Sequence, residues 1–69
     1  MPNIVHETML GYFAYDHLPE KLQAVSAPFH VLATVLADRA EAGDASGAET
    51  TVAMRKLLES KDAAVRAAL

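Results

Sequence analysis

The chain has 69 residues, a net charge of −3 at neutral pH, no cysteine and 52% hydrophobic residues. A chain of this length forms one domain (1–69), and without disulfides it usually needs a metal or self-association to be stable. The hydrophobic content excludes a disordered chain, and six basic against nine acidic residues argue against a general binder of DNA or RNA polymers.

Residues 1–17 form an entry segment before the first long helix. A short helix over about residues 4–10 is weakly indicated. The segment contains three of the four aromatic residues, and Phe13, Tyr15 and His17 follow one another at intervals of two. If the chain is extended here, this alternation places the three side chains on one side.

The first ten residues have neither a basic region nor a long apolar run, so we expect no signal peptide. The chain also lacks a stretch of about 20 apolar residues, the length that a membrane span requires. We therefore expect no membrane partner and a location in the cytoplasm.

The first long helix is expected over residues 18–42. Pro19 suits the first helical position and Gly43 suits the end of the helix, whereas Pro28 predicts a kink because it removes one backbone hydrogen bond. Apolar residues recur at alternating intervals of four and three, which is typical of a heptad seam. They are Leu18, Leu22, Val25, Phe29, Leu32 and Leu36.

The middle of this helix carries no charge: residues 22–37 include no Asp, Glu, Lys or Arg. A helix that is apolar on most sides must be buried on most sides, and one partner helix cannot cover it. We therefore expect other copies of the chain to cover it, which makes the protein a homo-oligomer. The second apolar face consists of Ala24, Pro28, Val31 and Val35.

A second helix is expected over residues 47–68, because Ser46 and Glu49 have the spacing of a capping box. Two helices joined by a short loop form an antiparallel hairpin. The predicted fold is all-α: a short N-terminal segment and an antiparallel helical hairpin with a proline-kinked long first helix, assembled as a homo-oligomer.

Signatures of an enzyme are absent from the sequence. It has no cysteine nucleophile and no glycine-rich phosphate loop, and its three histidines lack a metal-ligating helical spacing, so we expect no enzyme, cofactor or metal. Glu59 and Asp62 could pair as acid and base. Their spacing of four, three and four with Arg55 and Arg66 favours a solvent-facing ladder of ion pairs.

The residues that fit a ligand are aromatic and basic, because rings stack on nucleobases and cationic groups donate hydrogen bonds to phosphates. Alternatives stay open for the aromatic ones: Phe13 also fits packing against the hairpin, Tyr15 an interface, and His17 a helix cap or an exposed position. The candidate ligand-binding residues are Phe13, Tyr15, His17, Lys21, Arg55 and Lys56.

The stretch FAYDHLPEKLQAVSAPF, followed by ETTVAMRKLLESKDAAVRAAL, resembles the small helical-hairpin domain of phage anti-CBASS and anti-Thoeris sponge proteins. The similarity covers about residues 12–69. It rests on an aromatic–x–aromatic–x–His–x–Pro entry, a glutamine soon after it and a second helix that begins with glutamate. The resemblance implies a compact oligomer, typically a hexamer, that holds cyclic oligonucleotide second messengers between protomers in the bacterial host cell.

By this resemblance, Phe13, Tyr15 and His17 are the entry motif and Lys56 is the basic residue of the second helix. Lys21 and Arg55 are phosphate contacts inferred from charge alone. The chain lacks the proline expected in the loop and the β-rich portion of the anti-Thoeris relatives, which favours a pocket built from helices.

The predicted function is therefore to sequester a cyclic di- or trinucleotide without cleaving it, so that bacterial immune effectors stay inactive during phage infection. The alternative is a structural or protein-binding helical module with no nucleotide ligand. In that case the apolar face of residues 22–37 recruits another protein.

Overall fold

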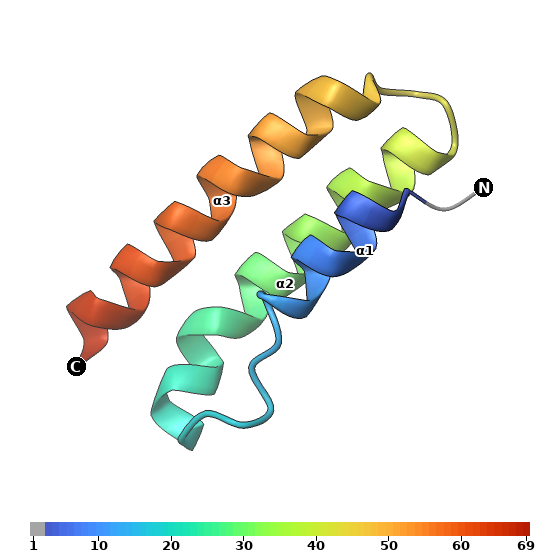
Figure 1. Cartoon of the computed structure of the whole chain (residues 1–69). Helices are drawn as coiled ribbons and strands as arrows, with labels where there is room; N and C mark the ends of the chain where they lie inside the picture. Colours follow the sequence, from blue (N-terminus) through green and yellow to red (C-terminus); the bar gives the residue numbers. More distant parts are fainter. Residues whose placement is uncertain (1–2) are drawn as a thin grey trace.

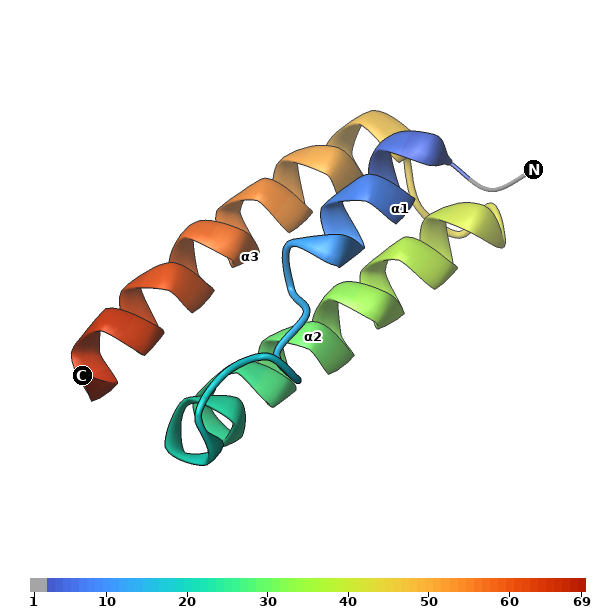
Figure 2. The same cartoon turned by 60° about the horizontal axis from the view of Figure 1, so that its bottom comes forward.

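The computed structural model describes residues 3–69. This part of the chain is all-helical, with three helices and no strands: α1 (Ile4–Gly11), α2 (Glu20–Glu41) and α3 (Gly47–Ala68). Helices α2 and α3 lie side by side and antiparallel (Figure 1), and α1 contacts both of them along the side where they meet (Figure 2). The prediction of an all-α fold is confirmed, and the hairpin carries a third helix.

Helix α1 begins at an asparagine cap and leads into turns. The side chain of Asn3 accepts a hydrogen bond from the backbone N–H of His6 at 3.2 Å. After the helix, the N–H groups of Phe13 and Leu18 donate to the carbonyls of residues three positions earlier, each at 3.0 Å. The entry segment is therefore turned rather than extended, and its aromatic side chains do not share one side as the alternation suggested.

Helix α2 begins one residue later than the proline pattern suggested. Pro19 is the N-cap, with an extended ψ of 149°, and Glu20 is the first helical residue. The helix continues through Pro28 to Glu41, and the kink expected at Pro28 stays a prediction. Gly43 follows with a φ of 84°, a left-handed conformation that glycine adopts without strain, as its place after the helix predicted.

The N-terminus of α3 follows the predicted cap. The hydroxyl of Ser46 accepts a hydrogen bond from the backbone N–H of Glu49 at 3.3 Å. This bond satisfies one of the donors that the first helical turn leaves free. The short loop before it therefore reverses the chain and sets α3 against α2.

The core lies where the three helices meet. On α2 the buried positions are Ser26, Ala33 and Ala37, whereas Leu32 of the expected seam is 47% exposed. The buried face of α2 is thus rotated about the helix axis from the predicted seam. Small residues at its centre allow the neighbouring helices to approach the α2 backbone, and larger residues pack on either side of them. The buried apolar residues are Met9, Phe13, Ala33, Ala37 and Met54, flanked by Leu10, Phe29, Leu36, Leu57 and Leu58.

Among residues 3–69, no helix combines the length and the apolar character that crossing a bilayer requires.

Candidate ligand-binding site

Tyr15 lies on the loop between α1 and α2, half-buried against the first half of α2. Its ring meets the ring of His30 edge to face, with centroids 5.6 Å apart and planes at 69°. The amide of Gln23 donates to the carbonyl of Leu18 at 2.7 Å and to that of Asp16 at 3.4 Å. These bonds fix the loop on α2, so that Tyr15 is presented in one defined position.

Phe13 lies in the core and is 0% exposed. No face of its ring is open to a ligand in this conformation. Its place agrees with the alternative that the sequence left open, packing against the hairpin. Phe13 therefore anchors the loop that carries Tyr15, and it does not itself line a surface.

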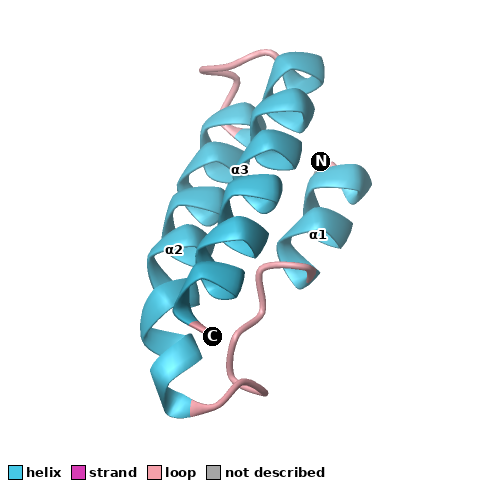
Figure 3. Ribbon diagram, turned by 90° about the vertical axis from the view of Figure 1, so that its left-hand side faces the viewer, coloured by secondary structure: helices cyan, strands magenta, loops and turns pink. Residues whose placement is uncertain are grey.

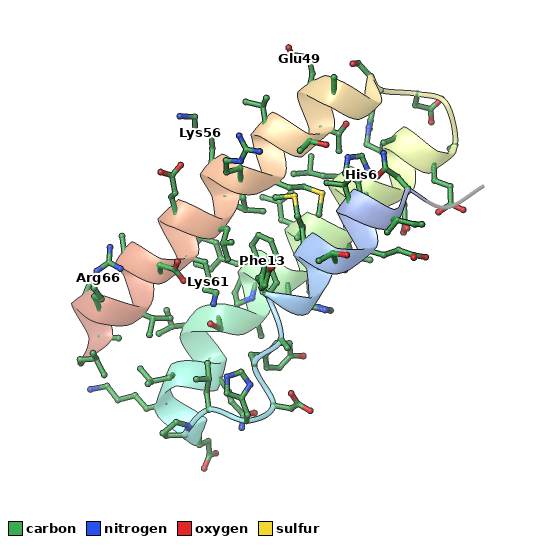
Figure 4. The ribbon with its side chains drawn as sticks, viewed as in Figure 1. His6, Phe13, Glu49, Lys56, Lys61 and Arg66 are labelled. Carbon is green, nitrogen blue, oxygen red and sulfur yellow. The ribbon has the colours of Figure 1, made fainter. Side chains whose placement is uncertain are left out.

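The four remaining candidate residues, His17, Lys21, Arg55 and Lys56, are exposed. Figure 4 shows Lys56 pointing outward from α3. The antiparallel hairpin places Arg55 level with about Ala33, which is about 12 residues or roughly 18 Å along the axis from Lys21. One chain therefore does not bring Lys21 to the same small ligand as Arg55 and Lys56.

The charged stripe on α3 is exposed, as the ladder hypothesis requires, but its side chains do not form the expected ion pairs. In the part of the chain that the structure describes, the ion pair within 4.0 Å joins Lys61 and Asp62, at 3.4 Å. These residues are neighbours in sequence and the Asp62 side chain is 50% exposed, so the pair contributes little to stability. The side chain of Lys61 is 13% exposed and points inward (Figure 4).

The described residues 3–69 contain no group of three side chains placed to hold a metal ion and no enclosed pocket.

His6 is a buried polar residue that the sequence did not single out. It is 3% exposed, and its Nε2 lies 2.8 Å from the hydroxyl of Thr51 and 3.1 Å from the carbonyl of Gly47. Since a carbonyl only accepts, the Nε2–H tautomer fits both neighbours. The ring therefore ties α1 to the first turn of α3, a role for which the sequence carries no local signal.

The second apolar face of α2 is uncovered in one chain. Val31 is 60% exposed and Val35 46%, and Ala24 and Pro28 on the same face are also exposed. In Figure 3, neither α1 nor α3 covers the left-hand side of α2, the side that faces away from the core. A stripe of exposed apolar side chains of this kind is typical of a surface that binds another protein chain.

Neither a protein-family model, nor a curated protein, nor a solved structure matches the chain.

Proposed function

We propose that the protein is a non-enzymatic sponge, that is, a protein that sequesters a signal molecule by binding it. In this proposal it is a homo-hexamer that binds a cyclic di- or trinucleotide between its chains without cleaving it. The observation that carries the proposal is the fixed presentation of Tyr15. The loop that holds it is anchored in the core by Phe13 and on α2 by Gln23. This loop contains the FAYDHLP motif on which the resemblance rests.

The chemistry of the proposal is recognition alone. Stacking of a base on Tyr15 would contribute about 1–3 kcal/mol. The guanidinium of Arg55 and the ammonium of Lys56 would donate charge-assisted hydrogen bonds to phosphates, and His17 lies on the same loop as Tyr15. Binding of the whole signal molecule lowers its free concentration, so that no bond has to be broken.

The site in this proposal lies between chains. One chain has a net charge of −3, and its Lys21 lies far from Arg55 and Lys56. A single chain therefore does not favour the binding of an anion. The symmetry of an oligomer gathers Arg55 and Lys56 from several chains around one point, and desolvation there strengthens each contact. The absence of an enclosed pocket within residues 3–69 is compatible with a shared site.

In the cell, the proposal places the protein in the cytoplasm of a bacterium under attack by a phage. There it would hold the cyclic nucleotide that activates immune effectors. A bend of α2 at Pro28 would shape the surface that the chains share.

Calorimetric titration of the purified protein with cyclic di- and trinucleotides tests the proposal, and recovery of intact ligand tests the absence of cleavage. We expect Tyr15→Ala to weaken binding about 5- to 150-fold, the equivalent of one lost base stack. Tyr12→Ala is the matched control, because Tyr12 is 58% exposed and lies outside the assigned set. The absence of heat with every nucleotide at micromolar protein would refute the proposal.

A second candidate is a protein-binding helical module, and the exposed Val31 and Val35 favour it. In that case the α2 face recruits a different protein rather than another copy of the chain. Sedimentation separates the two: a self-sufficient hexamer supports the sponge, whereas a monomer that binds no nucleotide supports the module.

A further inference from the structure

The exposed face of α2 is an apolar stripe with opposite charges at its two ends. Its members recur at intervals of three and four, and every one of them is exposed. The face lies opposite the buried Ser26 and Ala33, so that it points away from the core of its own chain. From the start of α2 to its end the stripe consists of Lys21, Ala24, Pro28, Val31, Val35 and Asp38.

This stripe is self-complementary when two copies of α2 run antiparallel. With the centre of the crossing between Phe29 and His30, Val31 of one chain lies level with Pro28 of the other. In the same register Val35 lies level with Ala24. Apolar residues spaced alternately three and four positions apart pack in layers of this kind when two helices pair. The inner four positions of the stripe therefore all meet apolar positions.

The charges at the ends agree with the same register. Lys21 of one chain lies level with Asp38 of the second copy, and by symmetry this pair occurs at both ends. Glu20 and Arg39 lie at these same levels, so each end carries two acidic and two basic side chains. The agreement of the apolar and the charged positions is what makes this register specific.

The competing arrangements do not have this complementarity. A parallel pair places Lys21 opposite Lys21 and Asp38 opposite Asp38, which brings like charges together. An antiparallel pair shifted by one heptad places Lys21 opposite Val31 and leaves its charge on the apolar seam without an acidic residue opposite. Neither arrangement places opposite charges against each other at both ends of the stripe.

We propose that α2 pairs antiparallel with α2 of a second copy of this chain, about a two-fold axis between Phe29 and His30. This inference depends on the homo-oligomer of the proposed function and specifies one of its interfaces. It assigns Lys21 to the edge of that interface, which explains why Lys21 lies far from Arg55 and Lys56. It requires no nucleotide.

Analytical ultracentrifugation of the whole chain gives the first test. We expect the wild type to sediment as an even multiple of the 7.4 kDa chain. Val31→Glu places a charge next to Pro28 of the second copy and is expected to halve the number of chains in the particle, or to leave monomers. Val5→Glu on α1 is the matched control, because Val5 is also exposed, at 53%, and lies outside every proposed contact between chains, so the mass is expected to stay unchanged.

A charge exchange gives a test that does not disturb the apolar seam. Lys21→Glu faces Asp38 of the second copy, and Asp38→Lys faces Lys21, so each single variant brings like charges together at both ends. We expect each to raise the dissociation constant about tenfold. The double variant restores opposite charges and is expected to recover wild-type assembly, which a merely structural role of either residue would not produce.

The register itself can be read from disulfides, since the chain has no cysteine of its own. A mixture of Ala24→Cys and Val35→Cys chains is expected to form a mixed disulfide on oxidation, because these positions face each other. Ala24→Cys chains alone are expected to stay unlinked, because two copies of position 24 lie at different levels of the pair.

An unchanged mass for Val31→Glu, or Ala24→Cys chains that link to themselves faster than to Val35→Cys chains, overturns the pairing. Either result leaves the sponge intact if the protein still binds a cyclic nucleotide in the titration. The converse, the mixed disulfide without nucleotide binding, supports the pairing and removes the sponge.

Discussion

Replacement of His6 by alanine tests how α1 is held. The variant removes the Nε2 hydrogen bond to Thr51 and the packing of a ring that is 3% exposed. The hydroxyl of Thr51 still donates to the carbonyl of Gly47 at 3.0 Å, so neither group loses its last partner. A neutral hydrogen bond of about 1 kcal/mol and the lost burial together give an expected loss of about 2 kcal/mol.

That loss is large for a chain of this size, whose total stability is roughly 3–10 kcal/mol by the usual value per residue. Urea unfolding at one fixed protein concentration measures the free energy of unfolding, and a fixed concentration is needed because an oligomer is stabilised by mass action. The control is His17→Ala, an exposed histidine, for which we expect a change within about 0.5 kcal/mol.

A second variant separates the hydrogen bond from the burial. The Nδ1 atom of His6 is buried without a hydrogen-bond partner, which opposes folding. His6→Leu removes that atom and keeps most of the apolar volume, so it is expected to cost less than His6→Ala, about 1 kcal/mol. If His6→Ala changes the unfolding free energy no more than His17→Ala does, His6 does not hold α1 and the argument is wrong.

Three further variants test the core and the helix ends. Phe13→Ala removes a ring that is 0% exposed and is expected to cost about 3–5 kcal/mol, which circular dichroism would record as partial or complete loss of helix. Gly43→Ala forces a Cβ into a φ of 84° and is expected to lower the unfolding free energy by about 1–2 kcal/mol in a urea titration. Ser46→Ala removes the cap of α3 and is expected to cost about 1 kcal/mol, seen as a thermal midpoint lower by about 4–8 °C; an unchanged midpoint would show that the cap contributes nothing.

The hairpin was predictable because its signals are local. Ser46 and Gly43 act within a few residues of where they stand, so the ends of the helices follow from the sequence. The buried face of α2 was predicted in part: Phe29 and Leu36 pack against the core as expected. Leu32, however, is more exposed than Ser26, although leucine is the more hydrophobic residue. Which face is buried depends on how closely the neighbouring helices approach, and the sequence of α2 alone does not contain that information.

The candidate site was predictable only in part. The sequence proposed Tyr15 as a ligand or interface residue and left the burial of Phe13 as an alternative, but it carried no sign of the turn that separates their directions. His6 was missed because its partners, Gly47 and Thr51, lie 41 and 45 residues away. In the proposed function, Arg55 and Lys56 meet a ligand between chains, and a single sequence gives no distances between chains.

The link between His6 and Thr51 also has a consequence for the order of folding. Helix α1 has eight residues, too few to be helical in water without support. Its support comes from the hairpin, since it packs against both α2 and α3. We therefore expect α1 to be stable only on the closed hairpin and to be the unit that opens first when the protein fluctuates. Each such opening transiently removes one wall of the core.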